Sequence, residues 1–197
     1  MNSPSPLLLV ITRRHIPDTL WDELPAQLPP AQTPHLFFTG EGTILATAPL
    51  PLWSQARRVV CTHAFLQHWR HPPPPLPNLT AGSLAHLGRL LRECTLATTL
   101  PLPTWPLQPG TPGNKQVAVP LGTDLASTET LESLRLAVGL AGCQHRVTIY
   151  RETGWNSNPP SAKEFPAEAR AYLDLMSELG ITFHSGPEGG ESVILRI

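Results

Sequence analysis

The chain has 197 residues, 41% of them hydrophobic, which is enough to form the core of one larger domain or two small ones. Its formal net charge is −1, so overall charge provides no drive toward nucleic acid or an anionic membrane. Only 15% of the residues are charged and 24 are proline, so the surface is expected either to be partly covered by a partner or to contain many proline-rich loops.

The three cysteines form no CxxC pair, which argues against a disulfide scaffold and against a zinc ribbon. Residues 7–11 are apolar but far too few to span a membrane, and Arg13 and Arg14 follow them without a cleavage site. We therefore expect a soluble protein of the reducing cytoplasm.

The first hundred residues alternate strand-length apolar runs with helix-compatible runs. The expected strands are 7–12, 35–39, 59–61 and 96–100. The expected helices are 17–24, 43–48, the run from 62 through Trp69, and one that begins at Gly82-Ser83 with Ser83 as its cap. Gly40-Glu41-Gly42 lacks the spacing of phosphate-binding motifs and is expected to be a turn. The proline run 71–77 is expected to be a stiff connection.

Cys61 is the residue of greatest chemical interest because it closes the strand Val59-Val60 and directly precedes a helix. A thiol near a helix N-terminus meets unpaired backbone N–H groups and the positive end of the helix dipole, which favour the thiolate. Cysteine at the end of an apolar strand is also a common inert core residue. The local pattern therefore leaves a nucleophile and a core residue both open.

Residues 101–114 are rich in proline and glycine and predict a boundary, after which strands and helices alternate again. The expected strands are 115–120, 146–150, 181–184 and 192–195. One expected helix is capped by Ser127 and stops at Gly142, and another begins at Pro166 and stops at Gly180. We interpret the two halves as an internal duplication, and the whole as an α/β protein with mostly parallel sheets.

Several stretches resemble the DsrE/DsrF/DsrH family, which includes the TusB, TusC and TusD sulfur-relay proteins. Residues 60–66, Val-Cys-Thr-His-Ala-Phe-Leu, are similar to the stretch that carries the family's sulfur-accepting cysteine. Residues 35–42 and 82–100 resemble the family's second strand and its closing helix and strand, and residues 134–150 and 172–181 resemble parts of the same module. The resemblance implies two tandem three-layer DsrE-like modules, residues 1–104 and 115–197, with a linker at 105–114.

In a protein of this family, Cys61 would accept sulfur as a persulfide and pass it to a partner, and His63 would contact the persulfide. The resemblance also implies sulfur donor and acceptor proteins as partners, a homo- or hetero-oligomer, and no direct contact with nucleic acid or membrane. The second module has His184-Ser185-Gly186 where a cysteine would follow the strand, so it is expected to carry no sulfur. No cofactor is needed.

Two other hypotheses remain. A non-catalytic scaffold or binding subunit requires no reactive thiol, and the burial of Cys61 would favour it. Cys61, His63, His68 and His71 include metal-ligating residue types, but their spacing fits no standard zinc site, so no metal is expected. Cys94 and Cys143 are expected to be structural. No motif of a hydrolase, kinase or nucleotide-binding protein is present.

Overall fold

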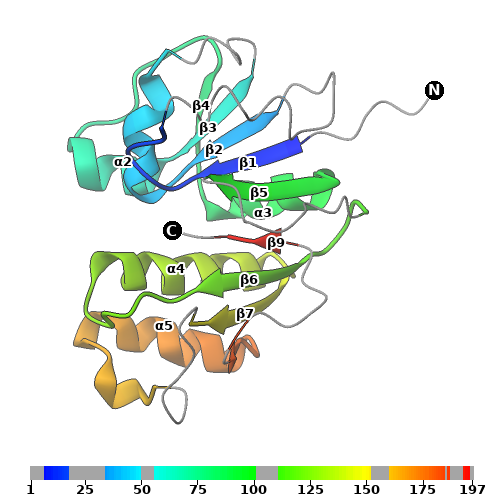
Figure 1. Cartoon of the computed structure of the whole chain (residues 1–197). Helices are drawn as coiled ribbons and strands as arrows, with labels where there is room; N and C mark the ends of the chain where they lie inside the picture. The colour runs from blue at the N-terminus through cyan, green and yellow to red at the C-terminus, as the bar shows by residue number, and fades with distance from the viewer. Residues whose placement is uncertain are drawn as a thin grey trace. The chain divides into compact units, whose positions relative to one another are not determined.

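The computed structural model describes residues 7–17, 34–49, 56–100, 111–151, 160–184, 186 and 193–195. The chain divides into two compact units, Met1–Gly113 and Asn114–Ile197, called unit 1 and unit 2 below. Each unit contains one sheet, and all the strand pairings of the described residues are parallel (Figure 1). The protein is therefore an α/β protein with two parallel sheets, as the alternation of strand and helix patterns predicted.

Unit 1 has a five-stranded sheet in the order β4-β3-β2-β1-β5. Its strands are β1 Leu7–Ile11, β2 His35–Phe38, β3 Arg57–Cys61, β4 Leu79–Gly82 and β5 Leu96–Leu100. All five residues of β1 are buried, because this strand has neighbours on both edges and side chains packed on both faces. The continuous apolar run that predicted this strand therefore reflects burial on both faces.

Three helical segments cover the two faces of this sheet: η1 Gly40–Thr47, α2 Thr62–Trp69 and α3 Leu84–Glu93. Phe65 of α2 belongs to a buried cluster with Val60 of β3, whereas His86 of α3 lies beside Val59. Because neighbouring residues of a strand point to opposite faces, α2 and α3 cover opposite faces. Unit 1 is thus a three-layer arrangement of helix, sheet and helix.

Strand β4 was not predicted. Gly82 was expected to begin a helix, but it is the last residue of β4, and α3 begins at Leu84. The four residues of β4, Leu-Thr-Ala-Gly, include little apolar surface because β4 lies at the edge of the sheet, where its side chains are exposed or half-buried. A search for apolar runs therefore misses this strand.

The expected turn Gly40-Glu41-Gly42 is instead the first turn of η1. Gly40 has φ +53°, a left-handed conformation that suits glycine. The Gly42 N–H donates hydrogen bonds to the carbonyl oxygens of Thr12 at 2.8 Å and Thr39 at 3.1 Å. These two bonds tie together the carboxyl ends of β1 and β2.

Unit 2 has a four-stranded sheet in the order β8-β7-β6-β9. Its strands are β6 Gln116–Pro120, β7 Arg146–Tyr150, β8 Thr182–His184 and β9 Val193–Ile194. Its helical segments are α4 Thr128–Gly142, η3 Ala162–Glu164 and α5 Ala167–Glu178. The Ser127 side chain accepts a hydrogen bond from the Thr130 N–H, so the predicted cap of α4 is confirmed.

The two sheets share an order of strands. In each, the first strand is internal, the second and third follow on one side, and the last strand pairs with the first on its other side. By this correspondence β6, β7, β8 and β9 match β1, β2, β3 and β5, and among the described residues unit 2 has no match for β4. The duplication inferred from the sequence stays a prediction.

Some expectations fall on residues outside those described. These are most of the helix expected at 17–24, the linker up to residue 110, and Ser192 at the start of the last expected strand.

Candidate functional site

Cys61 lies where the sequence predicted, at the junction of a strand and a helix. It is the last residue of β3 and the N-cap residue of α2, with an extended backbone (φ −64°, ψ 108°). Its side chain makes no capping hydrogen bond to the helix. The backbone geometry needed for a thiol at a helix N-terminus is therefore present.

The side chain of Cys61, however, is buried, since the residue is only 1% exposed. Val60, which precedes it, packs with Phe65 of α2, so alternation along β3 directs Cys61 to the opposite face, together with Val59. That face is covered by α3, whose Leu87, Leu90 and Leu91 are also buried. The thiol thus points into the layer between β3 and α3 and away from the body of α2.

Sequence reasoning missed a histidine in this layer. Gly82 pairs with Cys61 in the register of β3 and β4. A Cβ atom added to Gly82 would lie 2.5 Å from Val59 Cγ1 and 3.1 Å from His86 Nδ1, so the His86 ring occupies the space that this glycine leaves free. The layer that contains Cys61 therefore also contains an imidazole. Recognition of β4 would have placed His86, the third residue of α3, over this end of the sheet.

The ionisation equilibrium of His86 is shifted toward the neutral form, because its pKa is lowered. Burial, followed by the charges of Arg89 and Arg57, lowers the pKa of His86, and only Glu93 opposes this. Its Nε2 atom is buried and has no hydrogen-bond partner among the described residues. A neutral imidazole can accept a proton from a thiol, but no contact between His86 and Cys61 is observed.

His63, the other predicted site residue, is exposed on α2 and does not share the buried layer with the thiol. The two arginines at the start of β3 also lie away from the thiol. Arg58 donates two hydrogen bonds to the carbonyl oxygens of Ala46, at 3.2 Å, and Ala48, at 2.8 Å, at the end of η1. Arg57 is four residues before Cys61, about 13 Å along an extended strand. Alternation along β3 also directs Arg58 to the face opposite Cys61.

The remaining cysteines are the C-cap residues of two helices. Cys94 ends α3 and is buried, and Cys143 ends α4 and is half-buried. In the described part of the chain, no group of three or more His, Cys, Asp or Glu side chains is arranged to hold a metal ion. The combination of Cys61 with His63, His68 and His71 therefore does not form a ligand set.

The position in unit 2 that matches Cys61 contains no thiol. The matching strand, β8, ends at His184, and the sequence continues with Ser185 and Gly186. The Nε2 atom of His184 is 2.8 Å from the hydroxyl oxygen of Thr182 in the same strand. Unit 2 therefore has no thiol at the position that matches Cys61.

None of the helices in the described ranges has the length and apolar character required to cross a membrane. Comparison of the chain with protein-family models, with curated proteins and with solved structures found no match.

Proposed function

We propose that this protein is a non-catalytic binding subunit built from two DsrE-like modules, which acts by assembling with other protein chains. The observation that carries the proposal is the burial of Cys61. A sulfur carrier must present its thiol to two successive proteins, and a thiol that is 1% exposed beneath α3 is not accessible to another protein's cysteine. The missing thiol at the matching position of unit 2 supports the same conclusion.

The second candidate is a persulfide carrier that uses Cys61. It is favoured by the position of Cys61 as the N-cap residue of α2 at the carboxyl end of a parallel strand. In this reaction the Cys61 thiolate attacks the terminal sulfur of a donor persulfide, and the donor leaves as a thiolate. An acceptor thiolate then attacks the terminal sulfur of the Cys61 persulfide and releases the Cys61 thiolate. Each step requires local opening of the layer between β3 and α3.

Intact-protein mass spectrometry after exposure to a low-molecular-weight persulfide distinguishes the two candidates. The variants are Cys61→Ser and, as a matched control, Cys143→Ser, because Cys143 is half-buried whereas Cys61 is buried. The binding subunit predicts that any added sulfur is lost in Cys143→Ser and kept in Cys61→Ser. A gain of sulfur mass that reductant reverses and that only Cys61→Ser abolishes would overturn the proposal and establish the carrier.

Alkylation kinetics give an independent measurement of the same burial. In the folded protein we expect iodoacetamide to modify Cys143 first, whereas Cys61 and Cys94 should react only in denaturant. Rapid alkylation of Cys61 under native conditions would show that the thiol is accessible and would contradict the argument from burial.

A further inference from the structure

The two units carry opposite charge. Residues 1–113 contain seven Lys and Arg against five Asp and Glu, a net charge of +2, and six of the eight histidines. Residues 114–197 contain seven Lys and Arg against ten Asp and Glu, a net charge of −3. No acidic residue occurs between Glu41 and Glu93, so the segment that contains α2 carries positive charge that no nearby carboxylate in the sequence neutralises.

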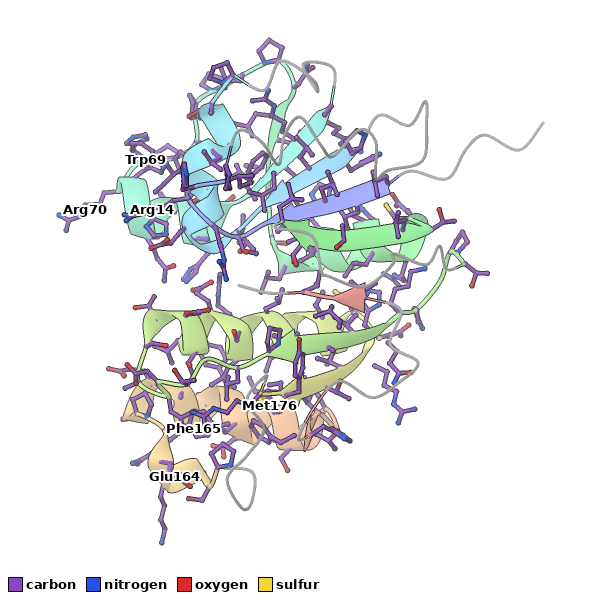
Figure 2. All side chains as sticks on the ribbon, viewed as in Figure 1. Arg14, Trp69, Arg70, Glu164, Phe165 and Met176 are labelled. Carbon is purple, nitrogen blue, oxygen red and sulfur yellow. The ribbon has the colours of Figure 1, made fainter. Side chains whose placement is uncertain are left out.

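An apolar surface lies within this basic segment. Leu66 and Trp69 of α2 are three residues apart, so they are neighbours on the helix surface, and they are 42% and 41% exposed. His63 precedes them on the same side, and Arg70 directly follows the helix; both are exposed. We call these four residues the α2 face. Figure 2 shows Trp69 and Arg70 at the surface of unit 1, with Arg70 extending outward.

The α2 face is pre-organised for binding. The Trp69 ring stacks on Phe65, with 5.9 Å between ring centroids, and it lies 6.0 Å from the ring of His71. A tryptophan already fixed by its neighbours loses little side-chain entropy when a partner covers it. Tryptophan and arginine are also the residue types most enriched among those that dominate binding energy.

Unit 2 carries an apolar surface with acidic neighbours. Leu175 of α5 and Leu179, the C-cap residue of this helix, are four residues apart and each is 42% exposed, and Ala171 lies one turn before Leu175. Glu168 and Glu178 are exposed on the same side of the helix. We call these five residues the α5 face. Met176, on the other side of α5, is buried and lies between α5 and α4 in Figure 2.

We propose that the α2 face of one copy of this chain binds the α5 face of a second copy. Leu66 and Trp69 of one copy would pack on Leu175 and Leu179 of the other and exclude water. The Trp69 ring would then lie over the small side chain of Ala171. Arg70 and His63 would then meet the carboxylates of Glu168 and Glu178. This contact gives the proposed binding subunit a specific partner, and it rests on that function. The two faces differ, so the contact is heterologous and leaves one free face at each end of a pair.

A contact between two helix faces buries less surface than the roughly 1,200 Å² of a standard interface. We therefore expect a dissociation constant of about 1–100 μM. Sedimentation velocity and light scattering of the full chain should show a mass that rises with concentration across this range. High salt should weaken the association, because exposed charges contribute to it.

Single variants of each face, and their mixture, test the heterologous arrangement. Trp69→Ala and Leu175→Glu should each weaken self-association about tenfold or more, and each protein alone should be monomeric. Trp69→Ala keeps an intact α5 face and Leu175→Glu keeps an intact α2 face, so a mixture of the two should form a 1:1 dimer that does not grow further. Leu76→Ala changes an exposed apolar side chain outside both faces and should associate as the wild type does.

Charge reversal tests the polar contacts. Arg70→Glu and Glu178→Arg should each weaken association, and combining them in one chain should restore it. Circular dichroism of the two charge variants should be unchanged, because Arg70 and Glu178 are exposed. A wild type that stays monomeric at 100 μM, single variants that associate normally, or a mixture that stays monomeric would overturn the contact. Uptake of sulfur by Cys61 would overturn the proposed function, whatever the oligomeric state.

Discussion

Replacement of Gly42 by alanine tests how tightly the carboxyl ends of β1 and β2 are joined. A Cβ atom at this position would lie 2.2 Å from the Ile11 carbonyl oxygen, 2.6 Å from its carbon and 2.8 Å from the Thr12 nitrogen. All three are backbone atoms, so no side chain can rotate to make room. Gly42 does not have a positive φ, so the cost of the substitution is steric rather than conformational.

The expected loss of unfolding free energy follows from the shift that the loop containing Gly42 must make. To reach an ordinary contact distance of 3.4 Å, the loop must shift by more than 1 Å, which breaks the hydrogen bonds from the Gly42 N–H to Thr12 and Thr39. Overpacking of about 1–3 kcal/mol and the loss of hydrogen bonding at about 1 kcal/mol each give a destabilisation of about 3–5 kcal/mol. The reduced entropy of the unfolded chain offsets at most about 1 kcal/mol of this.

Urea unfolding followed by tryptophan fluorescence measures the effect in the right unit, because four of the five tryptophans belong to residues 1–113. Gly142→Ala is the matched control. Gly142 lies at the end of α4, and apart from its chain neighbours and the backbone of its own helix no atom lies within 4 Å of the added Cβ. The substitution should be neutral or stabilising by up to about 1 kcal/mol. A Gly42→Ala protein destabilised by less than 1 kcal/mol would refute the steric argument.

Three further substitutions or conditions test the remaining contacts. Glu132→Gln should lower the free energy of unfolding by about 2 kcal/mol in urea titration, because the mostly buried Arg135 guanidinium loses its charged partner. Ser127→Ala removes the hydrogen bond that caps α4 and should lower it by about 1 kcal/mol. Burial, followed by the charge of Arg57, lowers the pKa of His35, and burial lowers that of His86, so the folded chain binds fewer protons than the unfolded chain. The free energy of unfolding of unit 1 should therefore be highest above pH 6.5 and fall as the pH drops through 6.5. A chain with both histidines changed to Gln should lose less of this free energy between about pH 7 and pH 5.

Each of these has a control within the chain. Glu93→Gln disrupts an exposed ion pair with Arg89 at 3.9 Å and should change stability by less than about 0.5 kcal/mol. Ser83→Ala should cost less than Ser127→Ala, because the Ser83 side chain makes no capping hydrogen bond. His63→Gln is the control for the two histidine substitutions, because His63 is exposed on α2. Equal effects in any test and its control would contradict the reasoning for that test.

Features that depend on local pattern were predictable from the sequence. The run Leu7–Ile11 is apolar because its strand is covered on both faces, and the junction at Cys61 follows from a short branched strand next to a helix-compatible run. The Ser127 cap follows from the hydrogen-bonding preference of serine at a helix start.

Features that depend on packing between distant segments were not predictable. Alternation along β3 directs Cys61 to the face of the sheet covered by α3, which begins more than twenty residues later, and no local pattern reports which side chains a later helix will cover. Strand β4 exists because the edge of β3 was free to pair, although its four residues have weak strand preference. Ser83 is an N-cap residue by position, yet its hydroxyl makes no capping hydrogen bond.

The internal position of β1 and β6 has a consequence for the order of events during synthesis. In unit 1, strands β1 to β3 can pair in turn as they leave the ribosome, but the second edge of β1 stays unpaired until residues 96–100 are made. In unit 2, the second edge of β6 waits for residues 193–194. Each sheet therefore has a central apolar strand with one unpaired edge during most of its translation. An unpaired strand edge can pair wrongly, so this is the interval in which the nascent chain most needs chaperones.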